Sequence, residues 1–388
     1  MMMNKRNSLF QWSFLVIALL SSSFLWGARI EVSGHISSST IWSPSDTIVV
    51  TDTLWVDFGV DLSLEAGVVV LVQTAAQGAG VIPWVIEGSL TVNGTESDTV
   101  FIIPASPEDY WGGIFFSAQV KSVQSLSYLH LDVGIGNPEY PPLIQSDYTS
   151  LDISHSSFKG QGSFAMALNG TQSKVNYCSF RLDQHGILHS RNNDFTEIEN
   201  SQSTVSESAW PVSMVFVNDS SSLKLLNNQF LNPHDGSSGY FISFNGRPGN
   251  QLFVDYNYFE KWGNVYVPYA NQGELFIRNN RYYDVHSIIQ NESGLAYVTG
   301  NSVHIPAGAT GSGIGLASAI YMSSAVITPI VHFNNNSCVK NSEATLPVFY
   351  IYDASGGVKS VPTIIANNNI IWGWDTFDLV NIYGGLLD

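Results

Sequence analysis

The sequence predicts an all-β fold, a solenoid of the parallel β-helix type, and three observations predict it. A short apolar pattern recurs along the chain, successive copies are roughly 21 to 35 residues apart, and no helical periodicity separates them. A coil that closes with strands and turns alone, repeated many times, is a parallel β-helix. Because each coil of a solenoid contacts only its neighbours, a chain of 388 residues can form one elongated domain.

The repeat is clearest in residues 223–230, which read Leu-Lys-Leu-Leu-Asn-Asn-Gln-Phe. Counted back from the anchor Phe230, the residues seven and five positions earlier are apolar, and the residue two positions earlier is Asn228. Alternating apolar residues are typical of a short strand with one buried face. The same classes recur in residues 151–158, 173–180, 252–259, 275–282, 296–303, 331–338 and 363–370, where Ser156 and Cys178 replace Asn in the two upstream copies.

We expect the position five before each anchor to face inward and to be buried in one stack. These residues are Ile153, Val175, Leu225, Val254, Ile277, Val298, Phe333 and Ile365. The amides two before each anchor should form a buried ladder in which each bonds the next, because successive coils lie about 4.7–4.9 Å apart. Its members are Asn228, Asn257, Asn280, Asn301, Asn336 and Asn368.

The long interval between Phe180 and Phe230 predicts one degenerate coil near residues 198–205, with Val205 as its anchor. The two cysteines of the chain, Cys178 and Cys338, fall in inward positions several coils apart. A disulfide needs Cα atoms within about 7 Å, so we expect two free, buried thiols.

The signature Leu-x-Ile-x-Asn-Asn-x-Phe resembles that of the right-handed parallel β-helix proteins of the pectin-lyase-like class, and the resemblance covers about residue 126 to the end. Residues 64–70, 88–95 and 111–114 look like the opening coils of large secreted bacterial β-helix proteins. The resemblance implies a right-handed solenoid. It does not imply one activity, since the class includes lyases, hydrolases and adhesins.

The first residues are typical of a secretory signal peptide. Lys5 and Arg6 precede an apolar run at 14–20 and three serines, and the run is too short to span a membrane. We therefore expect a signal peptide at 1–28, an N-terminal cap and first coils at 29–125, and regular repeats at 126–388 in one continuous domain. The mature chain, without a transmembrane segment, should be extracellular or at the cell surface.

Composition limits the partners. The net charge is −17, and only 12% of the residues are charged while 44% are hydrophobic. Such an acidic chain disfavours nucleic acid and anionic membranes, and it disfavours polyanions unless bound Ca²⁺ bridges them. A polysaccharide or a cell-surface glycan is left as the candidate partner.

The weak catalytic candidates lie together in one segment: Asp183, His185, His189 and Arg191. A lyase of this fold would place acidic Ca²⁺ ligands beside a basic residue that acts as the base. The Arg-x-Pro-x-x-Arg motif of the pectate lyases and the Asn-Thr-Asp, Gly-His-Gly and Arg-Ile-Lys motifs of the polygalacturonases are absent. We therefore interpret the segment as a polar corner, and we expect no metal and no cofactor, with Ca²⁺ needed only if the chain is a lyase.

A binding face is predicted in the loops just after the anchors, which hold His185, Trp210, His234, Asp235, Trp262 and His286. Stacked coils would align these loops into a shallow glycan groove, although the tryptophans could instead fold back as local packing. The favoured hypothesis is a secreted, non-catalytic β-helix that acts as a surface, adhesive or glycan-binding module. The alternative is a polysaccharide lyase or glycoside hydrolase with a diverged active site.

Overall fold

The computed structural model of the chain describes residues 28–73, 82–107, 109–120, 122–134, 141–160, 163–182, 186–192, 195–205, 213–218, 220–232, 240–261, 265–268, 271–285, 287–306, 320–323, 329–340, 349–352, 363–373 and 380–383. All of the regular structure in these residues is strand. A membrane-spanning helix is accordingly not found in this part of the chain.

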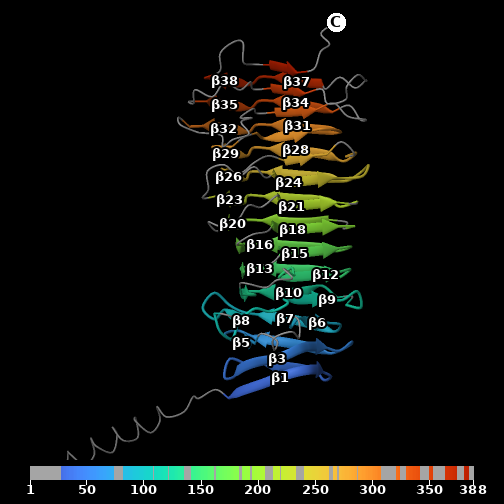
Figure 1. Cartoon of the computed structure of the whole chain (residues 1–388), viewed down its shortest axis with the longest axis vertical. Coiled ribbons are helices and arrows are strands. Elements are labelled where there is room, and N and C mark those ends of the chain that lie inside the picture. The colour runs from blue at the N-terminus through green and yellow to red at the C-terminus, as the bar shows by residue number, and fades with distance from the viewer. Residues whose placement is uncertain are drawn as a thin grey trace, which may run out of the picture.

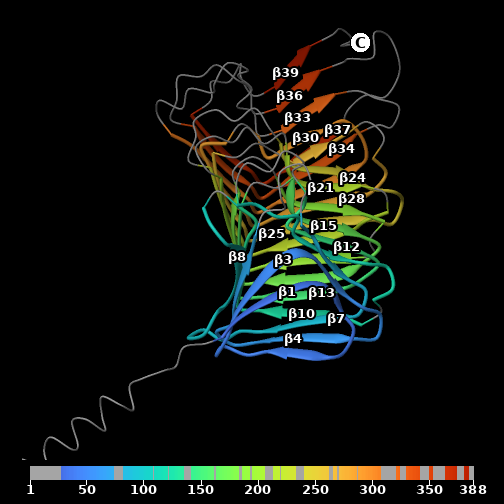
Figure 2. The same ribbon diagram turned by 60° about the horizontal axis from the view of Figure 1, so that its bottom comes forward.

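The strands pair in parallel and stack along one axis, so the predicted parallel β-helix is confirmed (Figure 1). In the turned view of Figure 2, strands of successive coils lie above one another on each side of the stack. Each coil passes in order through three faces, which we call the first, second and third face. The first face is the 13-stranded sheet, and the other two are the branches of the 26-stranded sheet.

The first face consists of β2 (Thr40–Trp42), β4 (Asp61–Glu65), β7 (Ser89–Asn93), β10 (Gln124–Ser127), β13 (Leu151–Ser154), β16 (Gln172–Asn176), β19 (Phe195–Glu199), β22 (Leu223–Leu226), β25 (Gln251–Asp255), β28 (Glu274–Arg278), β31 (Leu295–Thr299), β34 (Ile330–Asn334) and β37 (Thr363–Asn367). The long strands β1 (Arg29–Ile36) and β3 (Thr47–Val56) begin both branches of the larger sheet.

The second face continues with β5 (Val69–Val72), β8 (Val100–Pro104), β11 (Leu129–Asp132), β14 (Ser157–Gly160), β17 (Ser179–Leu182), β20 (Gln202–Val205), β23 (Gln229–Leu231), β26 (Tyr258–Glu260), β29 (Arg281–Tyr283), β32 (Ser302–Ile305), β35 (Ser337–Lys340) and β38 (Ile370–Trp372). The third face continues with β6 (Trp84–Ile86), β9 (Ile114–Phe116), β12 (Ile144–Asp147), β15 (Phe164–Asn169), β18 (Gly186–Arg191), β21 (Ser213–Asn218), β24 (Tyr240–Asn245), β27 (Val265–Val267), β30 (Ile289–Asn291), β33 (Ile320–Ser323), β36 (Phe349–Tyr352) and β39 (Val380–Tyr383).

The core register is as predicted in all copies except the last. The stack of paired inward residues runs through Ile153, Val175, Ile198, Leu225, Val254, Ile277, Val298 and Phe333, and all of them are buried. Ile198 belongs to the predicted degenerate coil, which is therefore confirmed. Its anchor is Ser203, which pairs with Phe230, so the prediction of Val205 as the anchor is wrong by two residues.

The last repeat was predicted one residue out of register. Ala366, not Ile365, pairs with Phe333, and Ile371, not Ile370, pairs with Cys338. Ile365 consequently faces outward and is 40% exposed. The paired isoleucines at 364–365 and 370–371 and the triplet of asparagines at 367–369 satisfy the apolar–Asn template in both registers, so the pattern alone could not choose between them.

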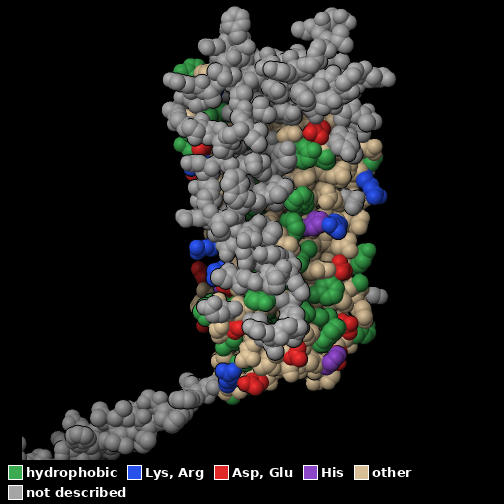
Figure 3. Space-filling model, in the orientation of Figure 1, with side chains coloured by type: hydrophobic (Ala, Val, Ile, Leu, Met, Phe, Trp, Pro, Cys, Tyr) green, Lys and Arg blue, Asp and Glu red, His purple; other side chains and the backbone are tan. Residues whose placement is uncertain are grey.

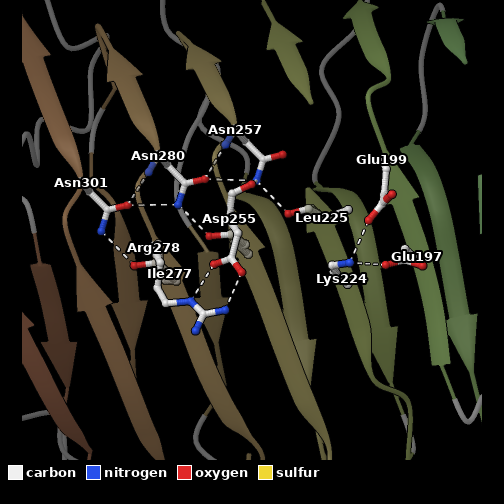
Figure 4. A network of polar contacts seen from close by, with 11 residues as sticks. Glu197, Glu199, Lys224, Leu225, Asp255, Asn257, Ile277, Arg278, Asn280 and Asn301 are labelled. Atoms are coloured by element: carbon white, nitrogen blue, oxygen red, sulfur yellow. Dashed lines mark hydrogen bonds and ion pairs between the residues drawn. The ribbon is translucent and has the colours of Figure 1, made fainter. Parts of the chain in front are cut away.

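The buried asparagine ladder is confirmed, with Asn369 rather than Asn368 at its end. It runs through Asn228, Asn257, Asn280, Asn301, Asn336 and Asn369, and each Nδ2 donates to the Oδ1 of the next at 3.0–3.2 Å. Figure 4 draws its central members. From Asn257 onward each Oδ1 also accepts the backbone N–H of the preceding coil's asparagine, which satisfies a donor that the bend would otherwise leave unpaired. Upstream, the Ser201 hydroxyl accepts the backbone N–H of Cys178 in the same way.

Both cysteines are buried and free, as predicted. Cys178 occupies the asparagine position of its coil, and its thiol contacts the carbonyl oxygen of Asn176 at 3.3 Å. Cys338 occupies the anchor position and pairs with Val303. Burial raises the pKa of each thiol to about 12.

Candidate functional site

Most residues of the predicted sites lie outside the described residues. These are Asp183 and His185 of the catalytic set, and Trp210, His234, Asp235, Trp262 and His286 of the binding set. They fall in the segments that connect the second face to the third. A glycan groove along these loops, and the solvated corner at Asp183 and His185, therefore stay predictions.

His189 and Arg191 of the predicted catalytic set are brought together on the outer side of β18. The Arg191 Nε donates a hydrogen bond of 2.8 Å to the His189 Nε2, and the imidazole packs against the rings of Phe164 and Phe216, which also contact each other. Burial, and to a smaller extent the charge of Arg191, lower the pKa of His189 to about 4. The imidazole is thus neutral near pH 7. Its Nε2 already accepts the Arg191 Nε–H, so in this contact that nitrogen is not free to act as a base.

The corner between the first and second faces turns on a single residue with left-handed backbone. This residue lies directly before the ladder position of its coil, which Leu129 occupies at the N-terminal end, and it has φ between 49° and 57° in the coils named next. It is Tyr128, His155, Tyr177, Asn200, Asn227, Tyr256 and Asn279 in successive coils. Gly adopts this conformation at low cost and Asn, Asp and His are enriched in it, whereas the bulkier tyrosine is unusual here.

A groove of about 960 Å³ follows this corner along the solenoid. One wall consists of the corner residues, and the other consists of the first outward residues of the second-face strands, namely Ser157, Ser179, Gln202, Gln229, Tyr258 and Arg281. The backbone of the buried ladder lies between them. The lining spans the coils from His155 to Arg281, which corresponds to roughly 24 Å at one strand spacing per coil. We call this feature the corner groove.

Stacked aromatic rings lie at the N-terminal end of the corner groove. The rings of Tyr128, His155 and Tyr177 stack with centroids 4.6 and 4.9 Å apart and with interplanar angles of 13° and 19°. Since these distances equal the coil spacing, the rings stack along the solenoid axis. Tyr177 therefore has one face against His155 and the other toward the next coil, that of Asn200. Tyr177 is 54% exposed and Tyr256 is 61% exposed.

Amide groups occupy the coils between Tyr177 and Tyr256. The Asn227 Nδ2 donates to the Asn200 Oδ1 at 2.7 Å, and the Asn200 Nδ2 donates to the Asn176 Oδ1 at 2.9 Å. Each primary amide has two donors and one accepting oxygen. These contacts therefore leave each amide a second N–H, and the same stretch of the opposite wall adds the amides of Gln202 and Gln229.

The charges of the lining are few. Among the described residues that line the corner groove there is no Asp or Glu, and Arg281 is the only Lys or Arg. On the side of the molecule seen in Figure 3, acidic and basic side chains are scattered among uncharged ones. Several basic residues of the first and second faces are paired, as in Arg278 with Asp255 and Lys224 with Glu197 and Glu199 (Figure 4).

A serine and a histidine meet beside the N-terminal end of the corner groove. The Ser157 Oγ and the His130 Nδ1 are 2.6 Å apart, and burial lowers the pKa of His130. Asp132, the acidic residue on the same strand, bonds instead to the Lys159 Nζ at 2.7 Å and to the Gly134 N–H at 2.8 Å. The contact is thus a pair and not a Ser-His-Asp triad, because none of the described carboxylates bonds to the imidazole.

The corner groove was missed in the sequence, although a signal for it exists. The position directly before the ladder residue carries Tyr or His in several copies where Asn would serve the turn. The predicted binding face lay in the loops after the anchors and did not include this position. Within the described residues no group of three or more His, Cys, Asp or Glu side chains could hold a metal ion.

Comparison of the chain with protein families, with curated proteins and with solved structures finds no match. The structure defines the chain as a parallel β-helix. Because this fold does not by itself imply one function, the corner groove is the feature that bears on function.

Proposed function

We propose that this chain is a secreted β-helix protein of the pectin-lyase-like class that binds an extended glycan in the corner groove. Residues 1–28 serve as the signal peptide in this proposal, and the mature chain acts outside the cell or at its surface. Its role is that of a surface, adhesive or glycan-binding module.

The observation that carries the proposal is the choice of residue at the corners. A left-handed conformation at a residue other than glycine costs of order 1–3 kcal/mol, and Asn is among the residues that tolerate it best. The chain uses Asn200, Asn227 and Asn279 at some corners, yet it uses Tyr177 and Tyr256 at others, with the rings largely in solvent. Two strained and exposed tyrosines in the lining of one groove point to a function for their rings, since the fold would be better served by Asn.

The chemistry of the lining suits a sugar chain. Exposed tyrosine rings offer flat apolar faces with a polar hydroxyl at the edge. The amides of Asn200, Asn227, Gln202 and Gln229 can donate to and accept from neighbouring hydroxyl groups. Equivalent groups recur at every coil, about 4.8 Å apart, and this spacing is comparable to the repeat of an extended glycan.

The shape and charge of the corner groove agree with the same ligand. It is long and open rather than a closed pocket, as an extended polymer requires. The described residues of its lining include no carboxylate, so the acidity of the rest of the chain does not oppose the binding of uncharged sugars. The His189–Arg191 contact offers no free base, and we therefore base no proposal of chain cleavage on it.

Affinity electrophoresis tests the proposal. The mature protein is run in native gels that contain a β-glucan, a xylan or a galactomannan, and the acidic protein migrates well without a ligand. We expect retardation by at least one polysaccharide, and we expect the double variant Tyr177→Asn/Tyr256→Asn to lose it.

Tyr148→Asn is the matched control. Tyr148 also has left-handed backbone, with φ of 60°, and it is also 61% exposed, but it does not line the corner groove. Its substitution should leave retardation intact. Equal mobility of the parent in all gels, or retention of the double variant, would contradict the proposal.

A further inference from the structure

Arg281 gives the C-terminal end of the corner groove a chemistry that the rest of the lining lacks. It is the first outward residue of β29, it pairs with Tyr258 and Ser302 of the neighbouring strands, and it is exposed. Among the described residues of the lining it alone keeps a positive charge at every physiological pH.

Among the described residues, no carboxylate forms an ion pair with the Arg281 guanidinium. Glu260, which faces outward from the adjacent strand β26, accepts the Tyr258 hydroxyl at 3.0 Å instead. Asp255, on the first face, is held by the Nε and Nη2 of Arg278. The guanidinium of Arg281 therefore reaches the open groove with its planar set of donors available, the geometry that suits a carboxylate or sulfate group.

We infer that the corner groove prefers a glycan in which a mostly uncharged chain carries isolated acidic groups, and that Arg281 binds the acidic group. This inference rests on the proposed function and adds the class of substrate. Arg281 lies one coil beyond Tyr256, so a sugar beside the Tyr256 ring can direct a carboxylate to the guanidinium. A uniform polyanion is disfavoured, because the net charge of −17 repels it and the described lining offers a single arginine to bind it.

The test compares two forms of one polymer. A glucuronoxylan has a neutral xylan chain with scattered uronic acid groups, and carboxyl reduction converts these groups to alcohols without changing the chain. In affinity gels the parent protein should bind the acidic form roughly tenfold more tightly than the reduced form. The difference should shrink as NaCl is added, because the contact is exposed to solvent.

The variant Arg281→Gln keeps hydrogen-bonding capacity but removes the charge. We expect it to lose the preference, and even to favour the reduced form, because the remaining net charge then repels the carboxylates. Arg181→Gln is the control, since Arg181 is an exposed arginine on the same face that does not line the corner groove. It should keep the preference of the parent.

The outcomes separate this inference from the proposed function. If the parent binds the reduced polymer but shows no preference for the acidic form, or if Arg281→Gln keeps that preference, the role of Arg281 is overturned and glycan binding stands. If neither form nor any neutral polysaccharide is bound, the proposed function is overturned together with the inference.

Discussion

Asn280 accepts two hydrogen bonds from Asn257 through a single oxygen. Its Oδ1 lies 2.8 Å from the Asn257 backbone nitrogen and 3.0 Å from the Asn257 Nδ2. The Asn257 Nδ2 also donates to the carbonyl of Leu225 at 2.9 Å (Figure 4). The Asn257 side chain therefore bonds to the coil before its own and to the coil after it. One buried side chain thus satisfies the backbone at the bend and links neighbouring coils.

Replacement of Asn257 should therefore destabilise the solenoid strongly. In Asn257→Leu the backbone N–H and the Nδ2 of Asn228 both lose their acceptor in a buried site. We expect a loss of roughly 2 to 5 kcal/mol, since each unsatisfied buried group costs about 1–3 kcal/mol. Urea unfolding followed by circular dichroism measures it, and Asn227→Gly, at the exposed neighbouring corner, should change stability by much less. Equal effects of the two substitutions would contradict the role of the ladder.

His189 should make stability depend on pH. Its pKa in the folded protein is about 4, whereas a histidine in the unfolded chain titrates near 6.5. Between these values the unfolded state binds more protons, so the contribution of His189 is complete above pH 6.5 and is lost as the pH falls toward 4.

The variant His189→Gln isolates this effect, because the glutamine oxygen can still accept from Arg191. Thermal midpoints measured between pH 7 and pH 4.5 should fall less in the variant than in the parent. The imidazole is only half-buried, so solvent screening should limit the difference between the two proteins in free energy of unfolding to about 1 kcal/mol. Parallel curves for the two proteins would show that His189 is protonated normally in the folded state.

The two thiols should be inert in the native protein. Cys178 and Cys338 are buried, and a pKa of about 12 leaves almost no thiolate at pH 8. Iodoacetamide at pH 8 should add nothing to the native chain, whereas in guanidinium chloride both cysteines should be alkylated without a reductant. The readout is intact mass. Modification of either thiol in the native state, or an unmodified pair after unfolding, would contradict their placement.

The fold could be predicted in detail because its determinants are local and repeated. The inward apolar residues and the asparagine at the bend recur in nearly every coil, so one copy supports the interpretation of the next. The prediction failed where the local signal was ambiguous, as at the asparagines 367–369, or weak, as at Ser203, which occupies a position that holds Phe in both neighbouring coils.

The corner groove could not be predicted with the same ease. Equivalent lining residues of successive coils are 22 to 29 residues apart in the chain, and they meet only because the coils stack. The backbone conformation that makes Tyr177 and Tyr256 unusual is not visible in a pattern of apolar residues. It becomes informative once the turn is known to need left-handed backbone.

Substitution of a corner tyrosine by Asn should stabilise the fold. Tyr256 has φ of 57°, and Asn adopts this conformation more readily, so Tyr256→Asn should gain about 1 kcal/mol. Thermal unfolding measures the change, and Tyr148→Asn should shift the midpoint in the same direction. Lower midpoints in both variants would show that the rings stabilise the corners by packing, which would remove the reason to assign them a ligand.

The most direct test of glycan binding in the corner groove is a calorimetric titration combined with a melting curve. Parent protein and the double variant Tyr177→Asn/Tyr256→Asn are titrated with an oligosaccharide from the polysaccharide that retards the parent most. The account predicts at least a tenfold loss of affinity in the double variant, together with a melting temperature equal to or above that of the parent. An unchanged affinity in the stably folded double variant would contradict it.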